Sequence, residues 1–337
     1  MIEVSAGIIR RKDGRLLVCQ RGEGQHNAHL WEFPGGKQEA GETPASCLCR
    51  ELMEELALPV ENISRYAQRV YGDIRLTFLA GETDAEPVPT EHEDVRFVTR
   101  EELLTLPFCP ADAPIARRLA LKGERLTCFI WDFDGTLMDT YPHMVLSMKR
   151  ALEDQGLFMG EKELLDLMKV SVPYCRDVLS EQHGLDRFAL QIGYWEHGKK
   201  LDRSQVQPIP GIPETLRELR RRGGRHFVYT HRDKGTFDYL RQAGLIDEFE
   251  DIITGDDGFR RKPEPDALLH LIEKHQLIPG ECVMIGDRPL DTACGRNAGM
   301  LSCMLDTEGR FSDDSAEYYT HDARLMPDLF LPLSGEG

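Results

Sequence analysis

A helix is predicted from Pro44 to about Leu58, and one of its faces carries three carboxylates. Glu51 is followed by Glu54 at position i+3 and by Glu55 at i+4, so the three side chains lie close together. Like charges at this spacing repel one another, and an isolated helix gains no stability from them. A divalent cation such as Mg²⁺ or Mn²⁺ would turn the repulsion into coordination, because these ions prefer carboxylate oxygens and keep positions open for phosphates. The helix therefore carries a candidate metal site for phosphate chemistry.

The ordinary alternative for such a cluster is a solvated acidic face, because glutamate is common on protein surfaces. The residues upstream weigh against that alternative. Gly36 and Glu42 precede Arg50 and the glutamates at fixed offsets, and average residue frequencies would produce this set on the order of once in 10⁷ positions. Gly35 and Gly36 would also let the backbone approach bound ions closely.

A second acidic pattern follows the apolar run Cys128–Trp131, which is predicted to be a buried strand. Asp132 and Asp134 come directly after it, at the edge of an open α/β sheet where ligands bind. Aspartates also begin turns and cap helices, which is the alternative explanation for any one of them alone. Several strand ends that converge with acids, a lysine and a hydroxyl indicate phosphoryl transfer on one Mg²⁺. The further residues expected near this edge are Thr230, Lys262, Asp287 and Asp291.

The elements that must position these residues differ between the two parts of the chain. Residues 1–121 combine short strands with the acidic helix, for which Thr43 is a plausible N-cap and Pro44 the first helical residue. This mixture predicts an α+β domain with a mixed sheet. The expected strands are Glu3–Arg10, Leu16–Gln20, Arg75–Ala80 and Arg96–Thr99.

Residues 126–310 alternate continuous apolar runs with helical patterns, which predicts a parallel, doubly wound α/β domain with a Rossmann-like core. Ninety-five residues, 132–226, separate the strand Cys128–Trp131 from the next one, Phe227–Tyr229. A single crossover does not need that length, so the segment from about 141 to 207 is expected to form an inserted helical cap. Residues 122–125 are the expected linker, and residues 311–337 a poorly patterned C-terminal tail.

Composition narrows the range of partners. The chain has 337 residues, a length that suggests two domains, and a formal charge of −17, which argues against polymeric nucleic acid and anionic membranes. No apolar run approaches a membrane span, and the first residues do not open a signal peptide. Nine scattered cysteines fit reduced thiols better than disulfides or zinc. A cytoplasmic protein is therefore expected, and its oligomeric state is left open.

The segment Gly36–Leu58 resembles the Nudix box, G-x5-E-x7-R-E-U-x-E-E-x-G-U, in which U is a bulky aliphatic residue. Every position matches except the late glycine, where the small residue Ala57 is expected to preserve activity. The preceding segment, Leu30–Lys37, is similar to the MutT-like branch of this family, and the likeness covers residues 1–121. The resemblance implies a Nudix fold and hydrolysis of a nucleoside triphosphate to the monophosphate and pyrophosphate.

The same resemblance assigns roles to residues of the first domain. It implies that Glu51, Glu54, Glu55 and the carbonyl of Gly35 hold metal, and that Arg50 positions Glu51 by an ion pair. The implied substrate contacts are Arg21 and Lys37, and a further acid from a later loop is either Glu91 or Glu93.

Asp112 lies in a segment that is similar to the one in which this branch places Asn or Asp against the base. An aspartate there resembles the cytidine-type pyrophosphohydrolases more than the enzyme for oxidised guanine. Asp112 would serve equally well as the N-cap of a helix over Ala113–Leu121, and both roles stay open.

The order D-x-D-G-T, hydroxyl, lysine and G-D-x3-D resembles the four motifs of the haloacid dehalogenase-like superfamily, over residues 126–306. The resemblance implies that Asp132 is the nucleophile and that Asp134 is first an acid and then a base. Thr230 and Lys262 would bind the transferring phosphoryl oxygens. The implied Mg²⁺ ligands are Asp132, the backbone carbonyl of Asp134, and Asp287, with Asp291 in support.

The inserted helices are similar to the small cap of the phosphoglycolate phosphatase and β-phosphoglucomutase branch. Lys169 and Arg176 are candidates for contacts with the leaving group, although a solvated cap surface is the favoured alternative for each. His231 and Arg232 follow Thr230 and are expected to line the substrate pocket.

The leading hypothesis is a bifunctional, Mg²⁺-dependent phosphohydrolase that acts on small nucleotides and phosphomonoesters, with Mn²⁺ as an alternative metal. The second domain would dephosphorylate a phosphomonoester, and fusion on one chain suggests the monophosphate product of the first. The alternatives are an unrelated sugar phosphate or phosphoglycolate as substrate, a mutase, or one domain that binds a ligand without turnover.

Overall fold

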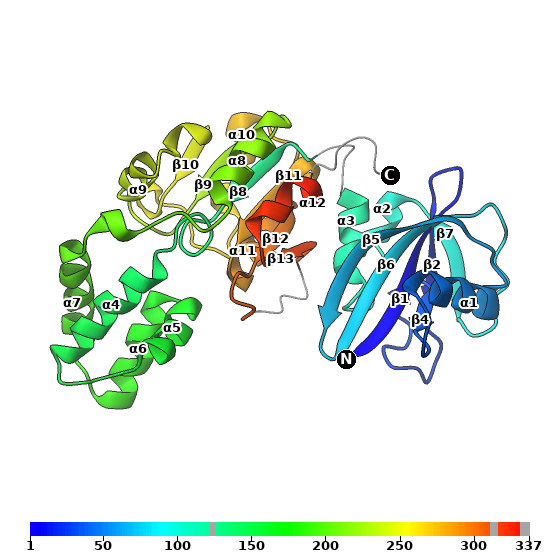
Figure 1. Ribbon diagram of the computed structural model, residues 1–337, viewed down its shortest axis with the longest axis horizontal. Helices are drawn as coiled ribbons and strands as arrows, with labels where there is room; N and C mark the ends of the chain where they lie inside the picture. The colour runs from blue at the N-terminus through cyan, green and yellow to red at the C-terminus, as the bar shows by residue number, and fades with distance from the viewer. Residues whose placement is uncertain (122–125, 311–315, 331–337) are drawn as a thin grey trace. The chain divides into compact units, whose positions relative to one another are not determined.

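The computed structural model describes residues 1–121, 126–310 and 316–330. They divide into two compact units, the first with residues 1–121 and 316–319 and the second with residues 126–310 and 320–330 (Figure 1). The expected linker 122–125 lies outside the described residues, as do residues 311–315 and 331–337 of the expected tail. None of the helices in the described ranges combines the length and the hydropathy of a membrane span.

The first unit contains a mixed sheet and a few helices, which confirms the α+β expectation. Its strands follow the order β3-β2-β1-β6-β5, with β4 paired to β1 and β7 paired to β2. β1 and β6 run parallel, whereas the other pairs are antiparallel. The elements are β1 (Ile2–Arg10), β2 (Leu16–Gln20), β3 (Trp31–Glu32), β4 (Gly35–Lys37), α1 (Pro44–Leu56), β5 (Glu61–Tyr71), β6 (Ile74–Glu82), β7 (Asp94–Val98), α2 (Arg100–Leu103) and α3 (Ala113–Leu121).

Helix α1 carries the acidic residues and begins as expected. Thr43 is its N-cap, and the Thr43 hydroxyl accepts a hydrogen bond from the Ser46 amide at 3.1 Å. The helix ends at Leu56, and Ala57 adopts a left-handed backbone with φ 49° and ψ 36°. This conformation favours glycine, which explains the glycine at that position of the Nudix box; the alanine costs about 1 kcal/mol.

The second unit contains the strands β10-β9-β8-β11-β12, in this order and all parallel; β13 follows β12 in the sheet, and the boundary between the two units falls within β13. This topology confirms the doubly wound, Rossmann-like expectation. Its elements are β8 (Cys128–Trp131), α4 (Tyr141–Glu153), α5 (Glu161–Val170), α6 (Val172–His183), α7 (Arg187–Lys200), η1 (Arg203–Gln205), α8 (Ile212–Arg221), β9 (Arg225–Tyr229), α9 (Thr236–Gln242), η2 (Ile246–Glu248), β10 (Asp251–Ile253), η3 (Gly255–Asp257), α10 (Asp266–His275), η4 (Pro279–Glu281), β11 (Cys282–Gly286), α11 (Pro289–Asn297), β12 (Leu301–Leu305), β13 (Tyr318–Thr320), η5 (Ala323–Leu325) and α12 (Met326–Phe330).

Alternate residues of the central strands pack on opposite faces of this sheet. Cys128 and Ile130 belong to a buried cluster with residues of α10 and α11. On the other face, Phe129 stacks on Phe330 of α12 with ring centroids 5.4 Å apart. Because both faces are covered, polar groups of the strands are exposed to ligands only at the strand ends.

Helices α4 to α7 lie between β8 and β9 in the chain, where the sequence predicts an inserted cap. They share a separate core that includes Met148, Leu164, Cys175 and Leu190. In Figure 1 these helices form a group beside the α/β core of the second unit.

Candidate active sites

The glutamates of the first unit stand on the side of α1 that faces away from the core. Leu48, Leu52 and Leu56 are fully buried among residues of β1, β2 and β6. This apolar stripe fixes the rotation of the helix, so that Glu51, Glu54 and Arg50 point to the other side.

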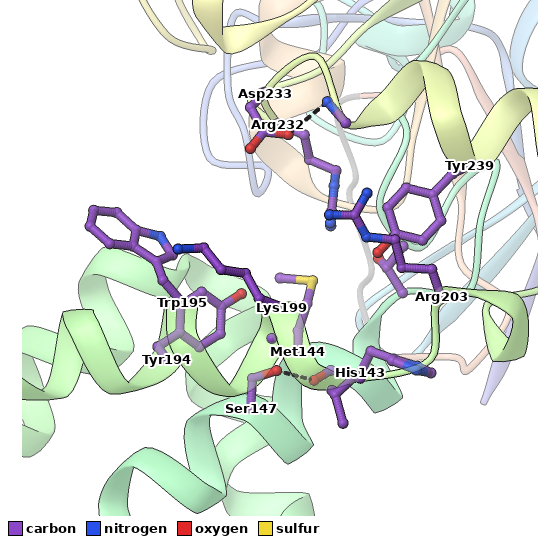
Figure 2. A pocket seen from close by; sticks show the side chains of 14 residues that line it. His143, Met144, Ser147, Tyr194, Trp195, Lys199, Arg203, Arg232, Asp233 and Tyr239 are labelled. Carbon is purple, nitrogen blue, oxygen red and sulfur yellow. Dashed lines mark hydrogen bonds between the residues drawn. The ribbon is translucent and has the colours of Figure 1, made fainter.

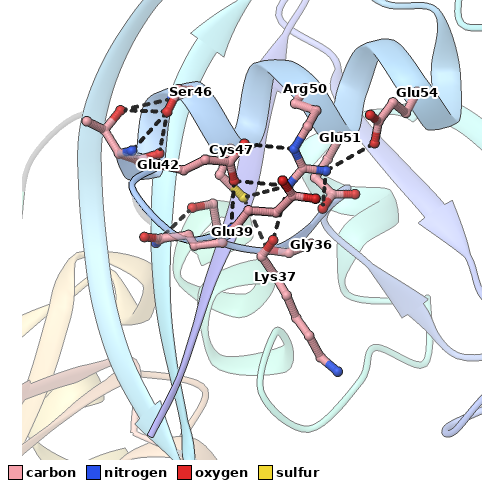
Figure 3. A network of polar contacts seen from close by, with 12 residues as sticks. Gly36, Lys37, Glu39, Glu42, Ser46, Cys47, Arg50, Glu51 and Glu54 are labelled. Carbon is pink, nitrogen blue, oxygen red and sulfur yellow. Dashed lines mark hydrogen bonds and ion pairs between the residues drawn. The ribbon is translucent and has the colours of Figure 1, made fainter.

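Arg50 is the centre of the polar network around these glutamates (Figure 3). Its guanidinium donates to both carboxylate oxygens of Glu42, at 2.7 and 3.0 Å. It also donates to Glu51 at 2.9 Å, to Glu54 at 3.0 Å and to the carbonyl of Lys37 at 3.1 Å. The hydrogen bonds from Arg50 are the main reason that the pKa of the Glu42 carboxyl is lowered to about 2. The loop before α1 and the acidic face of the helix are therefore held together by one side chain.

Two glycines allow close approach of the backbone, Gly36 to the carboxylate of Glu51 and Gly35 to the backbone of Ser5 in β1. A Cβ atom on Gly36 would lie 2.3 Å from that carboxylate, and a Cβ on Gly35 would lie 2.0 Å from the carbonyl oxygen of Ser5. Gly35 also has φ +152°, a conformation that side chains rarely adopt. The Gly35-Gly36 pair is thus required by close packing, which is consistent with a backbone ligand at this point.

Glu55 occupies the most acidic surroundings of the three. Burial raises the pKa of the Glu55 carboxyl to about 7, and the charges of Glu51, Glu91 and Glu32 add to the shift. Crowded carboxylates of this kind fit a divalent cation, because its charge would remove the repulsion.

The two candidates for the late acid have different surroundings. Glu93 pairs with Nδ1 of His29 at 2.7 Å, whereas the charge of Glu91 acts on Glu55. The effect of the Glu91 charge on Glu55 therefore favours Glu91 over Glu93 as the late acid.

Sequence patterns gave no signal for two neighbours of this acid cluster. Nε2 of His92 lies 3.8 Å from a carboxylate oxygen of Glu32 and 3.8 Å from one of Glu55. Burial lowers the pKa of His92 and raises that of Glu32. Arg21, expected to meet phosphates, pairs with Glu32 and donates to the carbonyl of His26 at 2.7 Å.

Asp112 and Lys37, the remaining candidates for substrate contacts in the first unit, have different surroundings. Asp112 is buried, and its carboxylate accepts a hydrogen bond from the amide of Phe33 at 3.2 Å. Burial raises the pKa of Asp112 to about 7. This bond leads to the segment before the glycines, rather than to the amides of α3 as an N-cap bond would. The side chain of Lys37 extends away from the polar network in Figure 3.

In the second unit, Asp132 and Lys262 form a buried pair at the end of β8. Nζ of Lys262 lies 2.6 Å from Oδ1 of Asp132 and 2.7 Å from Oδ1 of Asp291, and its side chain is fully buried. Burial raises the pKa of the Asp132 carboxyl, and the charge of Asp291 raises it further. Lys262 thus holds one oxygen of each aspartate and leaves the other oxygen available.

Three of the available oxygens converge. Within the described ranges, Asp132, Asp287 and Asp291 are the group whose candidate ligand atoms lie within 4.8 Å of one another. Oδ2 of Asp132, Oδ1 of Asp287 and Oδ2 of Asp291 are buried without a hydrogen-bond partner. Buried carboxylate oxygens in this state are costly unless a cation compensates them, so this donor set fits a hard divalent metal.

Arg288 faces the same three oxygens. Its guanidinium lies 3.9 Å from Asp132 Oδ2, 3.7 Å from Asp287 Oδ1 and 3.8 Å from Asp291 Oδ2, beyond hydrogen-bond distance in each case. Arg288 also lines the cavity over the aspartates. The sequence motifs assign it no role, and the structure makes it the cation that faces these three oxygens from the cavity side.

Lys169 reaches the core from the cap. Its Nζ lies 2.7 Å from Oδ2 of Asp287 and 4.1 Å from the ring centroid of Tyr141. The side chain is only 9% exposed, so the expectation of a solvated cap surface is wrong for Lys169. Arg176 instead bonds Asp177 and Gln191 within the cap and is 16% exposed, so it is not on a solvated surface either.

Asp134 is held by two donors. Its Oδ1 accepts from the Thr140 hydroxyl at 2.5 Å and from Arg232 at 2.7 Å. Thr230 is buried at the end of β9, and its hydroxyl accepts from the Arg232 amide at 3.1 Å. Each of the two aspartates is thus paired with its own cation, Asp132 with Lys262 and Asp134 with Arg232.

A cavity of about 560 Å³ opens above these groups, between cap and core residues of the second unit. His231 and Arg232 line it, as the sequence predicts, together with Asp134 and Arg288. Nε2 of His231 accepts from the Lys262 amide at 2.9 Å, and burial lowers the pKa of His231 to about 3. A neutral imidazole fixed in this way orients the Lys262 loop rather than transferring protons near neutral pH.

Arg288→Met is expected to tighten Mn²⁺ binding at the Asp132, Asp287 and Asp291 site by about tenfold or more, because it removes a cation that repels the metal. The measurement is electron paramagnetic resonance of free Mn²⁺ during titration. All proteins in this comparison should also carry Glu51→Gln and Glu54→Gln, which suppress Mn²⁺ binding in the first unit. Arg288→Lys keeps the charge and should resemble wild type; unchanged or weaker Mn²⁺ binding in Arg288→Met would refute the competition.

Comparison with known proteins gives a consistent result for each unit. The family model described as NUDIX domain matches residues 1–119, and the model described as haloacid dehalogenase-like hydrolase matches residues 129–305. The chain is 40% identical over 124 residues to an 8-oxo-dGTP diphosphatase of Haemophilus influenzae, which covers 35% of this chain and 91% of that protein.

Two further relatives divide in the same way. A CTP pyrophosphohydrolase of Escherichia coli is 36% identical over 135 residues, which are 37% of this chain and 96% of that protein. A phosphoglycolate phosphatase of Vibrio vulnificus is 30% identical over 197 residues, which are 54% of this chain and 84% of that protein. The relatives of the two units are therefore separate hydrolases, each similar to one part of this chain.

Proposed function

Because the chain belongs to the Nudix hydrolases through residues 1–119 and to the haloacid dehalogenase-like hydrolases through residues 129–305, we propose that it is a bifunctional, Mg²⁺-dependent phosphohydrolase. The first domain would hydrolyse a nucleoside triphosphate to monophosphate and pyrophosphate. The second would release inorganic phosphate from a phosphomonoester. The observation that carries the proposal is that each domain keeps its own complete acidic centre, one around Glu51, Glu54 and Glu55 and one around Asp132.

In the first domain, Glu51, Glu54, Glu55 and the Gly35 carbonyl would hold the metal. Bound divalent metal would neutralise charge on the polyphosphate and lower the pKa of the attacking water. Arg50 keeps Glu51 and Glu54 in place, and a carboxylate of the cluster would accept the proton of the water. Water adds to phosphorus, and the bond from that phosphorus to the oxygen that bridges the α- and β-phosphates breaks, which yields the monophosphate and pyrophosphate.

In the second domain, Asp132, Asp287, Asp291 and the Asp134 carbonyl would hold Mg²⁺, which would lower the repulsion between nucleophile and phosphate. A carboxylate oxygen of Asp132 attacks phosphorus, and Lys262 and Thr230 bind phosphoryl oxygens. Asp134 donates a proton to the leaving alkoxide as the ester bond breaks, and it then takes a proton from the water that hydrolyses the aspartyl phosphate. The short bond from Arg232 to Asp134 sets the direction of this carboxyl.

The two reactions would form a sequence in which the monophosphate released by the first domain is the substrate of the second. The similarities to an 8-oxo-dGTP diphosphatase and a CTP pyrophosphohydrolase support a modified or cytidine-type nucleotide for the first domain. The phosphoglycolate phosphatase relative supports a second candidate, a small phosphate ester as the substrate of the second domain.

A substrate screen with purified full-length protein and Mg²⁺ tests the assignment. Pyrophosphate and inorganic phosphate are measured separately for nucleoside triphosphates, monophosphates, sugar phosphates and 2-phosphoglycolate. The proposal requires pyrophosphate from at least one triphosphate and phosphate from its monophosphate. Phosphate release from 2-phosphoglycolate but from no monophosphate would support the second candidate, and release of neither product from any compound would refute both.

A further inference from the structure

The cavity lined by Asp134, His231, Arg232 and Arg288 is the reaction cavity of the second unit. A second cavity, of about 350 Å³, lies beside it. It lies between helices α4 and α7 and the segment that follows β9 (Figure 2). The two cavities have lining residues in common: Met144, Tyr194, Trp195, Arg232 and Asp233. A ligand that occupies the reaction cavity can therefore extend into this one.

The position of Arg232 relates the second cavity to the leaving group. Arg232 lines both cavities and donates to Asp134 at 2.7 Å. Asp134 is the residue to which the proposed mechanism assigns the proton for the leaving alkoxide. The part of the substrate that departs with that alkoxide is thus directed towards the second cavity.

Aromatic and thioether side chains form one part of the lining. Tyr194 and Trp195 stand on α7, Met144 stands on α4, and Tyr239 lies on the core side (Figure 2). Tyr239 is 9% exposed and is therefore held in place, whereas Trp195 is 57% exposed. Aromatic side chains that line a cavity next to a phosphate site are suited to a planar ring, because base stacking on aromatic side chains is favourable for every base.

Hydrogen-bond donors form the other part. Arg203, Lys199 and Arg232 are cations of the lining. The guanidinium carbon of Arg203 lies 5.5 Å from the ring centroid of Tyr239. Arginine and lysine only donate, so they select groups that accept. The carboxylate in the lining, Asp233, already accepts from the Gly235 amide at 2.9 Å. The lining is therefore rich in donors, although the whole chain carries a charge of −17.

We propose that this cavity binds the base of a nucleoside 5′-monophosphate, with the ring against Trp195 and Tyr194 and a base carbonyl oxygen on Arg203 or Lys199. The inference rests on the proposed function and names the substrate class of its second site. Uracil, cytosine and guanine carry a carbonyl oxygen that suits these donors, whereas adenine carries none. Uridine 5′-monophosphate should therefore be a better substrate than adenosine 5′-monophosphate.

The experiment compares kcat/KM for substrates that differ in what they place in this cavity. Uridine 5′-monophosphate carries a base, ribose 5-phosphate lacks one, and 2-phosphoglycolate carries a second anion. Trp195→Ala and Arg203→Met, in the full-length chain, should each lower kcat/KM for uridine 5′-monophosphate by about tenfold. The values for ribose 5-phosphate and 2-phosphoglycolate should stay within about twofold, since neither uses a base contact.

Arg241→Met is the matched control, because Arg241 and Arg203 both pair with Asp238 and only Arg203 lines the cavity. It should leave all three substrates unchanged. Equal losses for all substrates in Trp195→Ala and Arg203→Met would overturn the proposal, and so would no loss for any. A loss confined to 2-phosphoglycolate would also overturn it and would identify an anion subsite instead.

A binding measurement keeps this result separate from that of the proposed function. If the wild-type protein hydrolyses none of the three substrates, uridine binding decides the role of the cavity, and the wider substrate screen decides the proposed second activity. Quenching of tryptophan fluorescence by uridine that is lost in Trp195→Phe and weakened in Arg203→Met would support the base site. No quenching that depends on Trp195 would overturn it.

Discussion

Asp132→Asn is expected to lower the rate of phosphate release from every phosphomonoester by at least about 10⁴-fold. The rate of pyrophosphate release from nucleoside triphosphates should stay within about twofold of the wild-type rate. The amide has the shape of the carboxylate but is a far weaker nucleophile, and the change also removes one of the three carboxylates proposed to hold the metal. Phosphate and pyrophosphate assays on the same preparation check both parts of the expectation.

Stability needs a control in this variant, because Lys262 is fully buried and would keep only Asp291 as a carboxylate partner. Removing one partner of a buried pair leaves a charge that is less well compensated. Thermal melting should show that the second domain still unfolds cooperatively. If Asp132→Asn retains phosphatase activity in a folded protein, Asp132 is not the nucleophile.

Glu54→Gln is expected to have the opposite effect. Pyrophosphate release should fall by at least about 10²-fold, and phosphate release from phosphomonoesters should be unchanged. Glutamine keeps the length of the side chain and can still accept from Arg50, but it loses the charge that a metal ligand or base requires. The fold should be unaffected, because the Glu54 side chain is 61% exposed.

Glu39→Gln is the matched control for this change. Glu39 lies in the same network, where its backbone amide donates to Glu42 at 2.8 Å, and its carboxylate is not part of the proposed metal site. Glu39→Gln should keep pyrophosphate release near the wild-type rate. A similar loss in Glu39→Gln and Glu54→Gln would show that the effect comes from general charge rather than from a ligand position.

The sequence predicts the residues of both acidic centres because the motifs fix them by local spacing. Glu51, Glu54 and Glu55 share a helix face whatever surrounds the helix, and Asp132 and Asp134 follow a strand whose apolar run marks it as buried. The doubly wound topology then brings Asp287 and Asp291 to the same sheet edge, because β11 is the neighbour of β8.

Contacts between distant segments could not be predicted in this way. Lys169 reaches Asp287 only because the inserted helices fold back on the core, and nothing in the local sequence distinguishes it from a surface lysine. Arg288 and His92 acquire their roles from burial beside carboxylates that other elements supply. The sequence does not predict strand β5, because most of its side chains are exposed or half-buried and it therefore lacks a clear apolar alternation.

The most direct test of two consecutive hydrolytic sites on one chain is a ³¹P NMR time course of a single triphosphate with the full-length protein and Mg²⁺. Cytidine 5′-triphosphate and 8-oxo-dGTP are the first substrates to use, given the relatives of the first domain. We expect pyrophosphate and the monophosphate to appear first, followed by conversion of the monophosphate to inorganic phosphate. A reaction that stops at the monophosphate for every triphosphate that the protein cleaves would contradict the sequence of reactions.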